Sequence, residues 1–341
     1  MYENLTRLDL VGPALARALG DPGWERLEAS LISGGKSNLT FELTSDAGQA
    51  VLRRPPDGPL LPRAHDMGRE ARAQRALAAT AVPVPAILFE DAGELIGVPF
   101  YVMGKVDGYV VRDALPAGYA ESARDRRAIA DVLVDTLADL HAVDPADVGL
   151  SGFGRPSGLG ERQVRRWSDQ WERSKSRDVL AVDELARRLR ADPPAGPGGA
   201  IVHGDFRLDN CLMARQMPPS VAAVLDWELA TLGDPLADLG LLLFYWRQNG
   251  EAKPVLTPAP TMLPGFPPRS YLADRYAKRT GADLSDLPAW VALAHFKAAA
   301  IAQGIAARVQ AGSMAGQEFG DISAEVDRIA ADGLALLTER S

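Results

Sequence analysis

Cysteine, lysine and long apolar runs are all scarce in this chain. Cys211 is the single cysteine among 341 residues, so the chain can form no internal disulfide and cannot supply the several thiolates of a structural zinc site. No run of about 18 uncharged apolar residues occurs, so no membrane span is predicted. The N-terminus lacks a basic start followed by an apolar segment, and we therefore expect no secretory signal and a cytoplasmic location.

Basic residues are also fewer than acidic residues. Acidic residues number 45 against 37 lysines and arginines, which gives a formal net charge of −8. Proteins that bind nucleic acids cluster lysine and arginine against the phosphate backbone, and no such basic patch with interleaved aromatic residues is present. The composition therefore excludes nucleic acid and membrane as partners. Only six cations are lysines, so a role that requires lysine has few candidates.

Strand patterns dominate the first third of the chain. Short β-prone runs are separated by turns rich in glycine and proline, and one stretch rich in alanine, arginine and glutamate predicts a helix. We predict an antiparallel sheet with one main helix over residues 1–103. The expected strands are 27–32, 39–44, 50–54, 86–90 and 98–103, and the expected helix is 68–79.

Helical periodicity replaces these patterns from residue 104 to residue 341. Residues 121–142 place apolar side chains at helical spacing, and further helices are expected near 160–190, 236–248, 270–279, 287–310 and 322–338. Two strand-like runs, 210–214 and 221–227, interrupt them. The pattern predicts an α+β protein with two lobes, 1–103 and 104–341.

Two acidic segments next to these late strands carry the strongest chemical signal. Asp205 stands five positions before Asn210, and Asp226 ends the next apolar run. Phosphoryl transfer from ATP needs a carboxylate that orients the attacking hydroxyl, and oxygen ligands for the magnesium that bridges the phosphates. These three residues supply such groups. A single aspartate is more often a solvated loop residue or a helix cap, but the joined pattern favours the catalytic interpretation.

The His-Gly-Asp-x4-Asn run at 203–210, with Asp226 downstream, resembles the aminoglycoside phosphotransferase and choline kinase-like family. The likeness covers about residues 25–310 and is greatest to the branch related to kinase domains fused to acyl-CoA dehydrogenases. It implies a bilobal protein-kinase-like fold with a nucleotide-binding N-terminal lobe, and a kinase that uses ATP and Mg²⁺. It implies that Asp205 is the catalytic carboxylate, that Asn210 and Asp226 are magnesium ligands, and that His203 is structural.

The N-terminal lobe offers an independent test, because kinase-like folds hold the nucleotide phosphates with a strand cation braced by a helix glutamate. No lysine lies between residues 36 and 105, so an arginine must serve. Period-two alternation places Arg53 on the same face as Val51, and Arg54 points outward. We expect Glu70 to be the ionic partner of Arg53. Most family members have lysine here, and arginine is not its equivalent.

Two further segments of this lobe are expected to contact the nucleotide. The turn at residues 33–38 resembles a phosphate-covering loop, in which Ser37 or Asn38 reaches the phosphates; an ordinary hairpin turn is the equal alternative. Residues 100–106 resemble the hinge between lobes, where the backbone of Val102 and Gly104 would bond to the adenine edge.

Three basic and two acidic residues in the second lobe are further candidate site residues. Arg207 can meet the transferring phosphoryl group as a catalytic residue, and a solvated arginine is an equal alternative. In the alanine-rich helix at 287–309, charged residues at a buried rim are the favoured interpretation, and contact of Lys297 or Arg308 with an anionic acceptor is the alternative. The family resemblance further implies that Asp234 is a helix cap and that Asp238 is a structural partner that braces the catalytic loop.

The acceptor is less sharply predicted. A protein substrate is disfavoured because the chain lacks Asp-Phe-Gly, Ala-Pro-Glu and a long activation segment. The apolar surroundings of Lys297 and the branch resemblance favour a small hydroxyl-bearing acceptor, a hydroxyacyl-CoA or a hydroxy acid. An aminoglycoside-type antibiotic kinase and a catalytically silent nucleotide-binding protein remain alternatives. The oligomeric state is not predicted.

Overall fold

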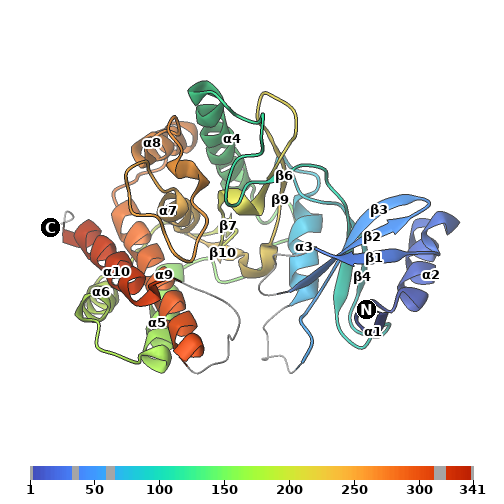
Figure 1. Ribbon diagram of the computed structural model, residues 1–341, viewed down its shortest axis with the longest axis horizontal. Coiled ribbons are helices and arrows are strands. Elements are labelled where there is room, and N and C mark those ends of the chain that lie inside the picture. Colours follow the sequence, from blue (N-terminus) through green and yellow to red (C-terminus); the bar gives the residue numbers. More distant parts are fainter. Residues whose placement is uncertain (1–2, 33–37, 59–65, 311–319, 339–341) are drawn as a thin grey trace. The chain divides into compact units, whose positions relative to one another are not determined.

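The computed structural model describes residues 3–32, 38–58, 66–310 and 320–338 (Figure 1). Ser37 and the rest of its turn before Asn38 lie outside these residues. The chain forms two compact units: unit 1 contains Met1–Gly108 and Ala222–Ala230, and unit 2 contains Tyr109–Val221 and Thr231–Ser341. The fold is therefore α+β, with an antiparallel sheet in the first unit and mostly helices in the second.

Unit 1 is built on a five-stranded sheet in the order β1-β2-β3-β5-β4, and every neighbouring pair is antiparallel. One face packs on the main core cluster, which includes Phe41, Leu52 and Phe100. The predicted hairpin, main helix and later strands are confirmed. Their bounds are β1 (Glu28–Leu31), β2 (Leu39–Ser45), β3 (Gly48–Arg54), α3 (Met67–Leu77), β4 (Ile87–Asp91) and β5 (Phe100–Gly104).

An N-terminal helical segment, which the sequence analysis did not predict, precedes this sheet. It consists of α1 (Glu3–Thr6), α2 (Leu8–Leu19) and the short turn η1 (Pro22–Trp24). Val11 and Leu15 of α2 are fully buried in the same cluster as the strand residues. Gly12 and Pro13 within α2 weaken the helical signal, because both residues have low helix propensity. Packing against the sheet compensates for that weakness.

The segment 222–230 belongs to unit 1 although it lies far along the chain. The N–H of Val224 donates to the carbonyl of Pro83 at 2.8 Å, and the guanidinium of Arg69 in α3 donates to the carbonyl of Ala230 at 2.9 Å. These bonds explain why the units differ from the expected division at residue 103. Unit 1 also extends through Gly108, beyond the end of β5.

Unit 2 is a helical assembly with short strand pairs. β7 (Ala200–Val202) pairs antiparallel with β10 (Thr231–Gly233), and β6 (Tyr109–Val110) with β8 (Cys211–Met213). Cys211 is buried, as expected of a small core residue. The helices are α4 (Ala123–Ala142), α5 (Leu159–Ser174), α6 (Leu180–Ala191), α7 (Leu236–Tyr245), α8 (Arg269–Thr280), α9 (Leu287–Gln310) and α10 (Ile322–Thr338).

Helix α9 forms the centre of unit 2 and packs against α5, α7 and α10 (Figure 1). It is the helix, among the described residues, whose length and composition would allow it to cross a membrane. However, 83% of its most apolar window is buried inside the structure. A helix that is apolar on nearly all sides is expected at the core of a large unit, and α9 fits that description.

Candidate active site

The loop after β7 is held by one buried carboxylate. Asp238, near the start of α7, accepts hydrogen bonds from the backbone N–H groups of His203 at 2.6 Å and Gly204 at 2.8 Å. Gly204 has φ +83°, a left-handed conformation that glycine adopts without strain. The predicted bracing role of Asp238 is therefore confirmed. His141 contacts the same carboxylate at 3.3 Å and fixes it from α4.

His203 and Asp234 also have the expected structural positions. The ring of His203 is fully buried, and its Nδ1 accepts a hydrogen bond from the backbone N–H of Asp205 at 3.2 Å. The carboxylate of Asp234 accepts the N–H of Leu236 at 2.9 Å where α7 begins. Both side chains therefore shape the loop and the helix that holds it.

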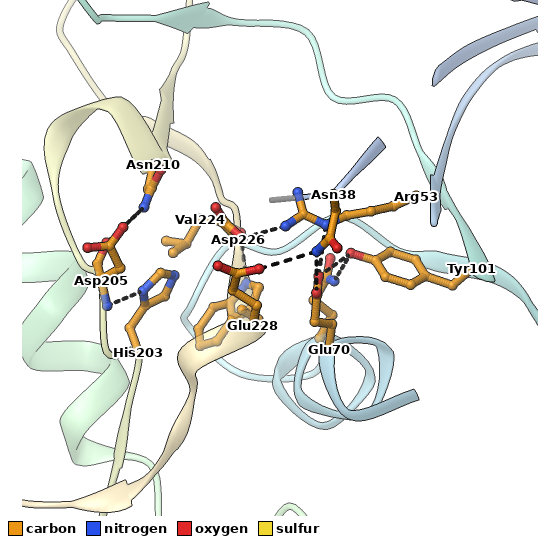
Figure 2. A network of polar contacts seen from close by, with 12 residues as sticks. Asn38, Arg53, Glu70, Tyr101, His203, Asp205, Asn210, Val224, Asp226 and Glu228 are labelled. Atoms are coloured by element: carbon orange, nitrogen blue, oxygen red, sulfur yellow. Dashed lines mark hydrogen bonds and ion pairs between the residues drawn. The ribbon is translucent and has the colours of Figure 1, made fainter. Parts of the chain in front are cut away.

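Asp205 lies in this loop among polar partners. The side-chain amide of Asn210 donates to the Asp205 carbonyl at 2.8 Å and to its carboxylate at 3.1 Å (Figure 2). Arg207 Nε lies 3.2 Å and Lys297 Nζ 3.8 Å from the two carboxylate oxygens. Burial by itself raises the pKa of Asp205, but Lys297 and Arg207 outweigh burial and lower it. The carboxylate is therefore anionic near neutral pH.

Arg207 is not a freely solvated side chain. Its Nε lies 3.2 Å from both Asp205 and Asp209, and its guanidinium lies 4.8 Å from the centre of the Tyr245 ring. Stacking and two ion pairs fix the arginine at the edge of the loop. Asp209 serves as an anchor for Arg207.

Lys297 is a site residue that the sequence analysis placed at a rim. It is 9% exposed, donates to the carbonyl of Gly204 at 3.2 Å, and lies 5.8 Å from the centre of the Trp167 ring. Burial lowers its pKa and Asp205 opposes that effect. A single lysine in an alanine-rich helix was the available signal. Its partner could not be identified because 92 positions separate Lys297 from Asp205 in the chain.

A second polar network lies within unit 1 (Figure 2). The predicted ion pair is present, since Arg53 Nε of β3 lies 2.9 Å from the Glu70 carboxylate of α3. Arg53 also pairs with Asp226. The Tyr101 hydroxyl donates to Glu70 at 3.0 Å, and the Asn38 amide donates to Glu70 at 3.1 Å. Asn38, Arg53 and Glu70 are thus brought together from three separate elements.

The charges of this network depend on burial. Burial raises the pKa of Glu70 to about 7, although Arg53 opposes the rise. Burial also acts to lower the pKa of Arg53, but Glu70 and Asp226 reverse that effect and raise it. The arginine therefore remains charged, whereas Glu70 can change charge near neutral pH.

Asp226 has a backbone conformation that differs from the predicted strand. The expected strand 221–227 ends early, because β9 spans Val221–Val224 and Asp226 adopts φ +67°. The following turn η3 (Trp227–Leu229) is fixed by the buried Trp227 indole, which donates to the carbonyl of Val224 at 3.0 Å. Aspartate tolerates the left-handed region better than most residues, and such conformations cluster at functional sites.

Glu228 was missed by the sequence analysis. Its carboxylate accepts a hydrogen bond from the Asn38 amide at 3.3 Å, so it joins the network of Arg53 and Glu70. Its position two residues after Asp226 was the available signal. The helical turn that directs both carboxylates into one network was not predictable from the strand-like pattern.

The expected outward direction of Arg54 is wrong in one respect. Alternation does separate Arg54 from Arg53, but Arg54 is only 4% exposed and donates to the carbonyls of Pro55 and Leu5. The N-terminal helical segment covers that face of the sheet. Arg54 is therefore a structural residue that ties the first helix to β3.

The main chain of β5 is largely committed to the sheet. Val102 is fully buried and pairs with Leu52 of β3 and Phe89 of β4. The N–H of Gly104 donates to the carbonyl of Ala86 at 2.8 Å. This N–H is therefore engaged inside the unit, and the adenine contact predicted for the backbone of Val102 and Gly104 stays a prediction that would use other main-chain groups. The Gly104 carbonyl and the chain after β5 remain as candidates.

The oxygen donors predicted for magnesium fit that ion chemically. The described residues contain no group of three or more His, Cys, Asp or Glu side chains placed to hold a metal ion. Magnesium usually takes one or two protein oxygens and completes its shell with water and substrate phosphates, so such a cluster is not required. Asn210 uses its amide nitrogen for Asp205, which leaves its side-chain oxygen as a donor. The Asp226 side chain is 33% exposed.

Comparisons with known proteins agree with one another on a family. Residues 28–257 match the model of the phosphotransferase enzyme family. The chain is 36% identical over 332 residues to acyl-CoA dehydrogenase family member 11 of Gallus gallus, covering 92% of this chain and 42% of that protein. It thus spans about two-fifths of the length of this curated relative.

Solved structures give the same result for the fold. A Ralstonia eutropha protein classed among the aminoglycoside phosphotransferases is 32% identical, with a TM-score of 0.79, covering 92% of this chain and 93% of that one. A thermostable mutant of the aminoglycoside phosphotransferase APH(4)-Ia, solved with ADP and hygromycin B, is 16% identical with a TM-score of 0.60, covering 96% of this chain and 98% of that one. The more distant likeness supports the fold alone.

Proposed function

Because the chain belongs to the phosphotransferase enzyme family, we propose that it transfers the γ-phosphoryl group of ATP to a hydroxyl of a small molecule, with magnesium. One observation carries the proposal. Asp205 is a carboxylate kept anionic by Lys297 and Arg207 and oriented by Asn210, in a loop braced by Asp238. Such a group is suited to orient an attacking hydroxyl and to accept its proton.

The chemical step assigns one role to each side chain. The acceptor oxygen forms a bond to the γ-phosphorus while the bond between that phosphorus and the β,γ-bridging oxygen breaks, and ADP leaves. Asp205 accepts the hydroxyl proton. Arg207, whose guanidinium is adjacent to Asp205, offsets negative charge on the transferring group. Magnesium, with Asn210 and Asp226 as its protein ligands, would supply charge neutralisation on the phosphates.

The nucleotide phosphates are assigned to the unit 1 network. Arg53 is a fixed cation on β3 and is braced by Glu70, which is the arrangement that kinase-like proteins use for phosphates. Asn38, at the end of the predicted phosphate-covering turn, is anchored to the same glutamate.

For the acceptor we propose a hydroxyacyl-CoA or a hydroxy acid. The curated relatives carry the names of acyl-CoA dehydrogenases, and the cations Lys297 and Arg207 flank the proposed base. A polycationic aminoglycoside would instead require an acidic surface beside Asp205. We therefore rank the antibiotic-kinase alternative second.

Acceptor-stimulated ATP consumption tests this proposal. The purified chain is assayed with ATP and magnesium against hydroxyacyl-CoAs, hydroxy acids, sugars, choline-like alcohols and aminoglycosides. We expect turnover with the first two classes and none without magnesium. Turnover with aminoglycosides alone would establish the second-ranked function. ATP binding without turnover on any acceptor would indicate a silent nucleotide-binding protein.

Nucleotide affinity should fall as the pH decreases through about 7. In this range Glu70 takes up a proton and loses the charge that fixes Arg53, so the cation is held less firmly for the phosphates. Titration calorimetry with ADP between pH 8 and pH 6, an interval of about one unit on each side of that pKa, measures the effect. Glu70→Gln should bind more weakly at pH 8 and lose most of the pH dependence. An unchanged profile in that variant would contradict the assignment.

A further inference from the structure

Helices α5 and α9 lie side by side in unit 2 (Figure 1). Trp167 of α5 lies beside Lys297 of α9, and the Gln303 amide of α9 donates to the carbonyl of Ser174, near the end of α5, at 3.1 Å. Residue numbers therefore increase along both helices in the same direction. The surface along their junction begins at Lys297, which contacts Asp205.

One face of α9 continues from Lys297 along this junction. Ile301, Gly304 and Arg308 follow at spacings of four, three and four residues, which keeps all of them within one side of a helix. Ile301 is 38% exposed and Arg308 is exposed. At a rise of 1.5 Å per residue, Arg308 lies about 16 Å along the axis from Lys297.

A cluster of donors surrounds Gly304 at the distal end. Arg173 donates to the Gln170 side-chain oxygen at 3.3 Å. A Cβ atom at position 304 would lie 3.3 Å from Gln170 Nε2 and 3.8 Å from the Arg308 guanidinium. The missing side chain thus lets Gln170 and Arg308 approach each other across the two helices. We call Arg173, Gln170 and Arg308 the distal cluster.

The two arginines of the distal cluster differ from those arginines of unit 2 that carboxylates hold in ion pairs. Arg187 of α6 and Arg275 of α8 each form close ion pairs with carboxylates. Within the described part of the chain, no carboxylate forms an ion pair with Arg173 or Arg308. Two arginines without ion pairs to described carboxylates, one bonded to Gln170 and the other beside Gly304, are suited to bind a planar anion with several donors.

We propose that the distal cluster binds the anionic end of an elongated acceptor whose hydroxyl reaches Asp205. Such an acceptor has a carboxylate or phosphate about 16 Å from its reacting hydroxyl, and an apolar chain that lies over Trp167 and Ile301. This assignment rests on the proposed function, because it places the reacting hydroxyl at Asp205. Lys297 does not contact the distal anion, because it lies about 16 Å from Arg308 along the helix axis.

Binding and turnover measured separately test the assignment. The probes are a long-chain ω-hydroxy fatty acid, its neutral methyl ester and the corresponding ω-hydroxyalkyl phosphate, each below its micelle concentration. The variant is Arg173→Gln/Arg308→Gln, and Arg165→Gln/Arg187→Gln on the same unit removes an equal charge elsewhere. Titration calorimetry without nucleotide should show binding of the charged probes weakened at least about tenfold in the first variant only. Methyl ester binding should be unaffected.

The comparison between probes and variants decides the assignment. The stronger of the two charged probes identifies the anion as carboxylate or phosphate. Three results would contradict the proposed anion site at the distal cluster. They are equal weakening in both double variants, equal affinity for the acid and its ester, and no binding of the charged probes. If charged probes bind as expected but wild-type protein consumes no ATP with them, the anion site stands and the proposed kinase function fails.

Discussion

Replacing Asp205 with asparagine should lower kcat by about three orders of magnitude and leave ATP affinity within about a factor of three. Asparagine has nearly the same shape and can still meet Asn210 and Arg207, but it cannot accept the acceptor proton. Steady-state kinetics gives kcat, and titration calorimetry with ADP gives the nucleotide affinity.

Asp209→Asn is the matched control for this variant. Asp209 lies in the same loop and contacts the same Arg207, yet the proposal gives it no proton to accept. We expect its kcat to fall less than about tenfold, because only an anchor of Arg207 is weakened. A wild-type kcat in Asp205→Asn, or an equal loss in both variants, would remove Asp205 as the base.

Replacing Asp226 with asparagine should weaken magnesium-dependent ATP binding at least about tenfold. Asparagine tolerates the left-handed backbone at this position, so the turn η3 should be retained. What disappears is the negative charge that would face the metal and that pairs with Arg53. The measurement is the ATP-induced increase in Tm, with and without magnesium.

Asp226→Gly separates the carboxylate from the backbone. Glycine accepts φ +67° without strain, so a fold defect is not expected from the conformation itself. Both variants should lose the magnesium-dependent part of the Tm increase to a similar extent. If that part persists in Asp226→Asn, Asp226 is not a magnesium ligand.

Local signals were sufficient for much of the fold and for part of the site. The hairpin of β1 and β2 and the helix α4 follow from strand-like and helical spacing, which depend on neighbouring residues alone. Period-two alternation separated Arg53 from Arg54, and the Arg53–Glu70 ion pair formed as predicted. The bracing of the catalytic loop by Asp238 also followed from the motif.

Features that depend on packing between distant segments could not be predicted from local sequence patterns. Helix α2 carries glycine and proline and is stabilised by a sheet that forms later in the chain. The burial of Arg54 depends on the segment that covers it, and the commitment of the Gly104 N–H depends on Ala86. In each case the partner comes from another element, and local propensity contains no information about it.

The sequence by itself determined the fold class, the family resemblance and the three oxygen-bearing residues Asp205, Asn210 and Asp226. These depend on spacing along the chain. The tertiary structure alone decided that Lys297 contacts Asp205, that Glu228 joins Asn38, and that residues 222–230 pack with unit 1. Electrostatic partners are set by distance in space, and folding brings together charges that the chain keeps far apart.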